Sequence, residues 1–247
     1  MTEQERSWLE GRISIMAALQ ASSRPIYQIY VQKGKWDRSL QRLKKTAVSH
    51  KIPLQTVTAD FIDERTGGQS HGGIVAEVGP RRFLPLADLL PTNTTPFIVM
   101  LDGIEDPFNF GQALRALYAA GADGVVVRPR NWLSAASIVA RSSAGASEQI
   151  PLAIAETSLE AATFFRQQGL IIACTSDKGA TSLYETDLAQ PIFLLIGGER
   201  RGITRSFLEQ ADIKVQIPYG RSFSYSLGAT GATAVISFEA ARQRGLA

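Results

Sequence analysis

Three segments of the chain combine glycine with polar side chains in patterns that could support chemistry. They are DGIEDPFNFGQALRALYAAG (102–121), LLIGGERRGI (194–203) and IPYGRSFSYSLGATGA (217–232). Each one starts within or at the end of an apolar run typical of a β-strand and then passes through a short loop. Glycine allows a ligand to approach the main chain closely, and charged side chains at such turns can bind polar substrates. Taken singly, each segment is more readily explained as a surface turn.

The first two segments carry the most reactive side chains. Asp106 and Pro107 predict a turn, and we expect Asn109 to cap a helix that begins near Gly111. Arg115 lies six residues after Asn109, among apolar residues of that helix. In the second segment, two glycines precede Glu199, which would then stand at the mouth of the sheet.

Several common kinds of active site are excluded. The segment GGERRGIT (197–204) has the glycine spacing of a phosphate-binding P-loop, but Ile203 stands where the lysine is required. No strand is followed by a dinucleotide-binding G-x-G-x-x-G, and no G-x-S-x-G nucleophile turn occurs. The only histidines, His50 and His71, are far apart, so we predict no metal site. Cys174 lies in an apolar run, and we expect it to be a buried filler of the core.

Composition predicts a soluble globular protein of the cytoplasm. The 247 residues carry a net charge of +3, with basic clusters at 42–45, 79–82, 128–130 and 199–201 that could bind phosphates. No apolar run is long enough to span a membrane, and the first residues lack a secretion signal. A single cysteine agrees with a reducing compartment.

The chain divides into two regions that both alternate strands and helices. A linker is expected at LADLLPTNTTPF (86–97). Before it we predict strands at 27–32, 53–59 and 72–78 and a helix at 37–50 capped by Asp37. After it we predict strands at 97–104, 124–129, 151–156, 170–176, 191–198 and 213–218, and helices at 111–122, 134–148, 158–169, 204–212 and from 227 onward. Apolar strands alternating with helices indicate an α/β fold with a mostly parallel sheet, whose ligands bind beyond the carboxyl ends of its strands.

Together, in this order, the three segments resemble the motifs of the SpoU/TrmH family of RNA ribose methyltransferases, part of the SPOUT class. The matching stretches are DPFNFG followed by Arg115, then GGERRG, then IPYGRSFSYSLG. The stretch SSAGASEQIP (142–151) resembles the family's small-residue segment. GRISIMAAL (11–19) and HGGIVAEV (71–78) resemble its auxiliary RNA-binding domain, so the resemblance covers nearly the whole chain.

The resemblance implies an architecture and an activity. Residues 1–88 would form an auxiliary RNA substrate-binding domain, and residues 96–247 a methyltransferase domain with a deep trefoil knot. The family transfers a methyl group from S-adenosylmethionine to a ribose 2′-hydroxyl. Because of the auxiliary domain we expect ribosomal RNA as the substrate, with transfer RNA as the alternative. A homodimer is also implied, with the last helix and the first-motif helix at the interface.

The resemblance also assigns roles to individual residues. The implied catalytic residues are Asn109, Arg115, Glu199 and Ser226, and the implied cofactor-binding residues are Gly197, Ile217 and Leu227. Arg115 would be central, either as a base or as a group that holds a phosphate. A guanidinium is a poor base and is better suited to the phosphate contact. Asn109 and Glu199 would position Arg115 or the ribose, and Ser226 would hydrogen-bond near the target hydroxyl.

Two departures from the family pattern leave an alternative open. Gly228 stands where the third motif has asparagine, and one extra residue separates Ile217 from Ser226, so Ser224 could take the serine's role. The alternative is therefore a relative that binds RNA but has lost catalysis. A small-molecule α/β enzyme would explain neither the three motifs nor the N-terminal region. We also expect the small residues from Gly228 to Ala232 to lie where chain, cofactor and partner subunit crowd together.

Overall fold

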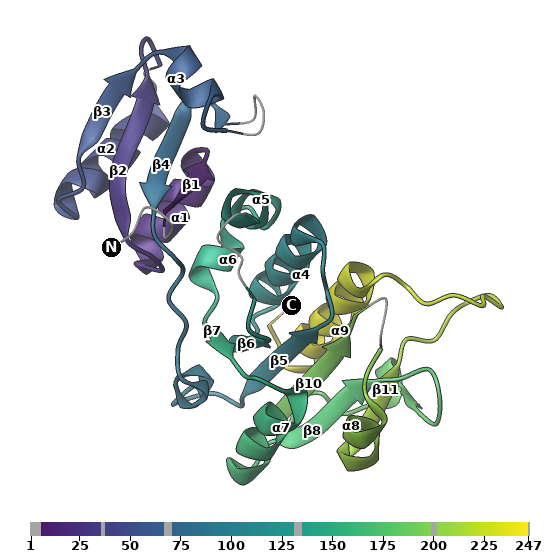
Figure 1. Ribbon diagram of the computed structural model, residues 1–247. Helices are drawn as coiled ribbons and strands as arrows, with labels where there is room; N and C mark the ends of the chain where they lie inside the picture. The colour runs from purple at the N-terminus through teal and green to yellow at the C-terminus, as the bar shows by residue number, and fades with distance from the viewer. Residues whose placement is uncertain (1–5, 36–37, 67–70, 131–134, 199–201, 247) are drawn as a thin grey trace. The chain divides into compact units, whose positions relative to one another are not determined.

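The chain forms two compact units, which are described separately. The computed structural model describes residues 6–35, 38–66, 71–130, 135–198 and 202–246 (Figure 1). The first unit comprises Met1–Arg82 with Asn131–Gln149, and the second comprises Phe83–Arg130 with Ile150–Ala247. None of the described helices is long and apolar enough to cross a membrane.

A four-stranded sheet organises the first unit. Its order is β1 (Ser7–Glu10), β4 (Ile74–Val78), β2 (Ile26–Gln32) and β3 (Leu54–Val57). The β4 strand is antiparallel to both neighbours, and β3 is parallel to β2. The helices are α1 (Arg12–Ala21), α2 (Arg38–Ser49) and α3 (Ala59–Asp63). The three predicted strands and the helix of this region are confirmed, whereas β1 was not predicted because four residues are too few to show a period. The predicted cap Asp37 lies outside the described residues.

The single helix predicted at 134–148 is wrong. The segment forms two short helices, α5 (Ala136–Ser142) and α6 (Ala146–Gln149), both within the first unit. Between them Ala144 and Gly145 have φ of 51° and 82°, which ends a right-handed helix. A Cβ on Gly145 would stand 2.7 Å from the Cβ of Ala17 in α1, so α1 packs closely against this break.

A buried ion pair holds α6 within the first unit. The Arg24 guanidinium donates Nε and Nη2 to the two carboxylate oxygens of Glu148, at 2.9 and 2.7 Å, and the Ser23 hydroxyl donates to the same carboxylate. Beside this pair, Arg81 donates to the Ser147 carbonyl at 2.7 Å. Burial lowers the pKa of Arg81 to about 10. Such a pair fixes the segment because the loss of one partner would leave the other charge buried and uncompensated.

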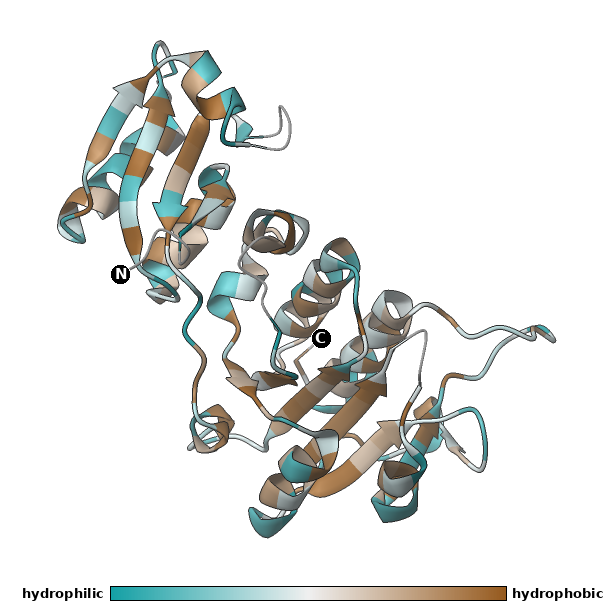
Figure 2. Cartoon of the chain, in the orientation of Figure 1, coloured by the Kyte–Doolittle hydropathy of each residue, from teal (hydrophilic) through white to brown (hydrophobic). Residues whose placement is uncertain are grey.

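The second unit is built on a seven-stranded sheet in which every strand pair is parallel, as predicted. Its order is β7 (Leu152–Ile154), β6 (Gly124–Val127), β5 (Phe97–Asp102), β10 (Ile192–Gly197), β8 (Ile171–Thr175), β11 (Ile213–Gln216) and β9 (Thr181–Ser182). The central strands β5, β10 and β8 are hydrophobic along their length (Figure 2). This composition is typical of parallel strands that are covered on both faces.

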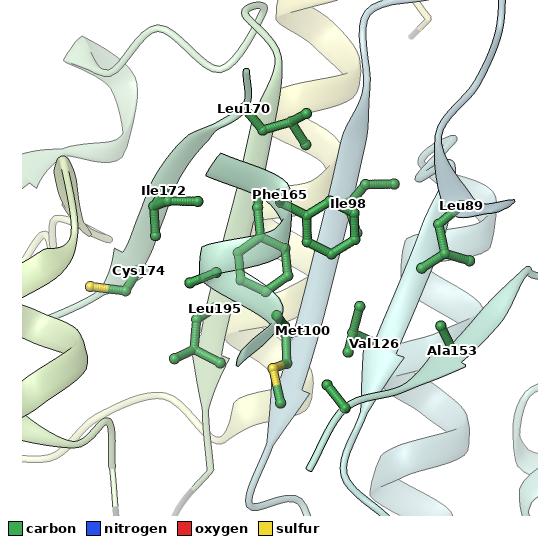
Figure 3. Packing of buried hydrophobic residues seen from close by; sticks show 14 of the residues in the cluster. Leu89, Ile98, Met100, Val126, Ala153, Phe165, Leu170, Ile172, Cys174 and Leu195 are labelled. Atoms are coloured by element: carbon green, nitrogen blue, oxygen red, sulfur yellow. The ribbon is translucent and has the colours of Figure 1, made fainter. Parts of the chain in front are cut away.

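Helices cover both faces of this sheet. On one face, α7 (Ser158–Gln167) and α8 (Arg205–Gln210) contribute Phe165 and Phe207 to the core, where Phe165 stacks on Phe193 with ring centroids 4.9 Å apart (Figure 3). On the other, α9 (Ala229–Gln243) packs on β10 and α4 (Pro107–Ala119) packs on α9. Cys174 is fully buried as expected, and burial raises the pKa of its thiol to about 11.

The proposed linker at 86–97 is partly wrong. Its first residues form the 3-10 helix η3 (Leu86–Leu89), and Leu89 is buried in the core of the second unit. A Cβ on Gly124 at the start of β6 would stand 2.9 Å from the Leu89 side chain. Only the later part of this segment, with its proline and threonine residues, is irregular.

Two main-chain turns touch at the carboxyl edge of the large sheet. Asp102 and Gly197 are paired in register at the ends of β5 and β10, and the next residues are Gly103 and Gly198. A Cβ on Gly198 would stand 2.0 Å from the Gly103 carbonyl oxygen, far inside van der Waals contact. Gly103 itself has φ of 90°, a conformation that favours glycine. The glycines at the strand ends are therefore needed so that the two turns can meet.

We predict that Gly198→Ala destabilises the protein by about 1–3 kcal/mol or more, because the added methyl forces main-chain atoms apart. Urea unfolding followed by circular dichroism measures the change. Gly220→Ala is the matched control, since a Cβ there meets nothing within 4 Å. The control should change stability by less than about 0.5 kcal/mol. Equal stability of the two variants would refute the close contact.

Candidate functional site

The first candidate segment is the turn from β5 into α4. The helix begins at Pro107, and its cap is Asp106, whose carboxylate accepts a 2.8 Å hydrogen bond from the Asn109 N–H. The predicted cap at Asn109 and helix start near Gly111 are therefore wrong. Aspartate directly before a proline is a strong helix start, because proline needs no hydrogen-bond partner at the first helical position. Asn109 is instead the third residue of the helix, with its side chain half-buried.

Arg115 lies further along α4 and is exposed, while its neighbours Ala113, Leu114 and Leu117 are buried. Its guanidinium makes no hydrogen bond or ion pair with any residue that the structure describes. A guanidinium that has no partner among the described residues, on a helix whose opposite side is packed, is suited to bind the phosphate of a ligand.

The second candidate segment is the turn after β10. The Gly197 N–H lies 3.5 Å from the Thr175 hydroxyl at the end of β8. A Cβ on Gly197 would stand 2.9 Å from Ile203, where the chain returns after the turn. The chain itself packs closely on both glycines, with Ile203 on Gly197 and Gly103 on Gly198, and the approach of a ligand to them stays a prediction. Glu199 lies outside the described residues, so its predicted contact with Arg115 is not described.

The third candidate segment is the loop 217–228, which joins β11 to α9. It extends away from the sheet edge (Figure 1). Ile217 is half-buried, whereas Ser226 and Leu227 are exposed, and the Leu227 N–H donates to the Tyr219 hydroxyl at 2.8 Å. Gly228 is the N-cap of α9 and provides no side-chain cap. The structure thus leaves Ser226 and Leu227 open to solvent.

The first and third segments meet where α4 packs against α9. The Thr230 hydroxyl, in the first turn of α9, donates to the Asn109 carbonyl at 3.3 Å. A Cβ on Gly231 would meet nothing within 4 Å. The crowding that we expected at Gly231 is therefore not produced by the described part of this chain.

Further polar groups at this edge were missed by the sequence analysis. Arg128, just beyond β6, lies 4.0 Å from the Asp102 carboxylate at the end of β5. Arg130 donates to the Ile104 carbonyl at 3.4 Å, and Thr175 faces Gly197 as described above. The signal was present, because Asp102, Arg128 and Thr175 each end an apolar run that predicts a neighbouring strand.

The edge has the features that a nucleoside cofactor requires. Gly197 ends β10 without a side chain over its main chain, and Ile217 and Leu227 leave apolar surface uncovered, which are features that suit a nucleoside. In the described residues no group of three or more histidine, cysteine, aspartate or glutamate side chains could hold a metal ion. The glycine at the end of β10 and the apolar surface at Ile217 and Leu227 are compatible with S-adenosylmethionine.

Comparisons with known proteins agree with this geometry. Residues 96–238 match the SpoU rRNA Methylase family, and residues 8–84 match the family described as RNA 2'-O ribose methyltransferase substrate binding. The chain is similar to the 23S rRNA (guanosine-2'-O-)-methyltransferase RlmB of Pseudomonas putida, with 33% identity over 95% of this chain and 95% of that protein. It is also similar to RlmB of Escherichia coli, with 30% identity over 95% of this chain and 97% of that protein.

Solved structures share the fold. A crystal structure described as an RNA 2'-O ribose methyltransferase has a TM-score of 0.80 and 26% identity, covering 98% of this chain and 90% of that chain. The SpoU methyltransferase AviRb from Streptomyces viridochromogenes, in complex with the cofactor AdoMet, has a TM-score of 0.81 and 22% identity, covering 98% and 91%. Because both halves match and the similarity runs from end to end, the chain belongs to the SpoU rRNA methylase family and is an S-adenosylmethionine-dependent RNA 2'-O-ribose methyltransferase.

Proposed function

We propose that the protein methylates a ribose 2′-hydroxyl of ribosomal RNA. The observation that carries this proposal is the end-to-end similarity to enzymes named for 23S rRNA, which includes the substrate-binding region at 8–84. Residues 1–88 would bind the RNA and residues 96–247 would carry the chemistry. The helices α5 and α6 pack within the first unit, although their residues lie in the 96–247 stretch that would carry the chemistry. The unit that would bind RNA therefore includes these two helices.

We propose that Arg115, Asn109, Glu199 and Ser226 act on the RNA. Bound S-adenosylmethionine supplies a methyl group on a positively charged sulfur, and the ribose oxygen must be aligned with it. The guanidinium of Arg115 offers only hydrogen-bond donors, so it would hold an RNA phosphate rather than act as the base. Asn109 and Glu199 would keep the guanidinium and the ribose in place, and the exposed hydroxyl of Ser226 would hydrogen-bond near the target oxygen.

Gly197, Ile217 and Leu227 are proposed to hold the cofactor. Gly197 ends β10, Ile217 follows β11 and Leu227 precedes α9. They would surround a ligand beyond the carboxyl ends of β10 and β11, which lie on either side of β8. The family's deep trefoil knot is proposed for the same region. The position of β10 between β5 and β8, and the packing of the last helix α9 on α4, support it.

The alternative function is a relative that binds RNA without methylating it. Gly228 favours it, because the N-cap of α9 has no polar side chain where the family has asparagine. The retained types at Asn109, Arg115 and Ser226 favour the active enzyme. Transfer of tritiated methyl from S-adenosylmethionine to bulk ribosomal RNA separates the two, and transfer RNA serves as the competing substrate.

Arg115→Ala should lower methyl transfer by about 10²-fold or more, since it removes a group that aligns the RNA. Binding of S-adenosylmethionine, measured by calorimetry, should stay within about twofold because Arg115 is proposed to contact the RNA and not the cofactor. Arg205→Ala is the control, since Arg205 is exposed and, among the described residues, forms an ion pair only with Glu209 on the surface of α8. Turnover of Arg115→Ala equal to that of wild type would reject this role.

We further propose a cytoplasmic homodimer in which α4 and α9 form the interface. Exposed Phe108 and Tyr118 on α4 and Phe238 on α9 support it, because large apolar side chains on two packed helices provide surface for a partner. A cytoplasmic location follows from the proposed ribosomal RNA substrate.

Light scattering coupled to size exclusion should give twice the chain mass of 26.8 kDa for the wild type. Phe238→Glu should shift the mass toward one chain, because a carboxylate would be buried without a partner. Tyr184→Glu, on the exposed η5 helix (Leu183–Glu185), should leave the mass unchanged. A wild-type protein that is monomeric at all concentrations would contradict the dimer.

A further inference from the structure

The loop 217–228 carries three aromatic side chains that the chain itself does not bury. Tyr219, Phe223 and Tyr225 are 41%, 59% and 75% exposed. We call these three residues the aromatic arm. Aromatic side chains each offer a large apolar area, so a soluble protein rarely leaves several neighbouring ones in water without a binding role.

The three rings of the arm contact one another. The Tyr219 and Phe223 rings have centroids 6.2 Å apart at 60°, and the Phe223 and Tyr225 rings have centroids 5.7 Å apart at 63°. The Leu227 N–H bonds the Tyr219 hydroxyl, which closes the base of the arm. The exposures of 59% for Phe223 and 75% for Tyr225 show that these two side chains stay largely open to solvent despite the ring contacts.

Charge indicates what kind of partner would cover these faces. Between Ile213 and Phe238 the chain has no aspartate or glutamate, while Lys214 and Arg221 are basic. Arg221 forms no hydrogen bond or ion pair with any residue that the structure describes. Serines 222, 224 and 226 alternate with the aromatic residues and offer hydroxyl donors. Exposed rings, a guanidinium without a partner among the described residues, and hydroxyls in a segment without acidic residues suit an anionic partner that has flat faces.

The position of the aromatic arm in the chain also indicates which partner would cover it. The arm leads directly into Ser226 and Leu227, which precede α9 and are proposed to contact the RNA and the cofactor. A second copy of the chain is instead proposed to cover the exposed apolar side chains of α4 and α9.

We propose that Phe223 and Tyr225, braced by Tyr219, form a stacking platform for unpaired RNA bases next to the target nucleotide, with Arg221 on the adjoining phosphate. This inference rests on the proposed RNA methyltransferase function. Unpaired bases stack on aromatic rings without regard to sequence, so the platform holds the strand while the catalytic groups act on one ribose.

The test uses the full chain carrying Phe223→Leu and Tyr225→Leu together. Leucine keeps apolar bulk but removes the ring faces, and Tyr219 is left intact because it holds Leu227. Tyr184→Leu is the control, since Tyr184 is an exposed tyrosine of the second unit outside the loop. Fluorescence anisotropy measures binding of a labelled single-stranded RNA of mixed, non-self-complementary sequence and of a duplex of equal length.

We expect the double variant to bind the single strand about fivefold or more weakly than wild type, with duplex binding, molecular mass and S-adenosylmethionine affinity unchanged. The control should bind like wild type. Unchanged single-strand affinity, an equal loss for the duplex, or a loss of dimer mass would each overturn the platform. Failure of the proposed function differs from these outcomes, because the wild-type protein itself would then transfer no methyl group to RNA.

Discussion

The contact between the main chains at Gly103 and Gly198 is the constraint on which the rest of the site depends. The strands β5 and β10 are parallel neighbours, so their following turns leave the sheet at one edge, and the absence of side chains lets them touch. One turn leads into α4 and so places Asn109 and Arg115. The packing of α9 on α4, with the Thr230 hydroxyl on the Asn109 carbonyl, brings the third segment to the same edge. The apolar core beneath supports these turns, but its packing does not determine which polar residues occupy them.

Much of the second unit could be predicted because its central strands are buried on both faces and read as continuous apolar runs. Predictions of helix ends and of the linker failed where a neighbouring residue or a distant contact outweighed the local sequence pattern. Asp106 caps α4 in place of Asn109, since a following proline fits the first helical position. The helix predicted at 134–148 breaks at Ala144 and Gly145, where the close approach of α1 matters more than helical periodicity. Leu89 is buried by a partner distant in sequence, which no local pattern of turn residues reveals.

At the candidate site, the sequence indicated which residues matter, but not which contacts they make. The spacing of the glycines and of Asn109 and Arg115, together with the family resemblance, placed the candidate site at the carboxyl edge of the sheet. The Asp102–Arg128 pair and the tie from α9 to α4 depend on contacts between distant segments, so they emerged only from the fold. The residues of the aromatic arm can be read from the sequence, but their exposure and the geometry of their rings come only from the structure. Loops are where a shared fold acquires its particular substrate.

A crystal structure of the protein with S-adenosylmethionine tests the central claim most directly. We predict that the cofactor lies beyond the carboxyl ends of β10 and β11, with its purine against main-chain groups and within contact distance of Gly197, Ile217 and Leu227. The methyl carbon should face the α4 helix that carries Arg115. A cofactor bound at the opposite edge of the sheet, or in the first unit, would contradict the account.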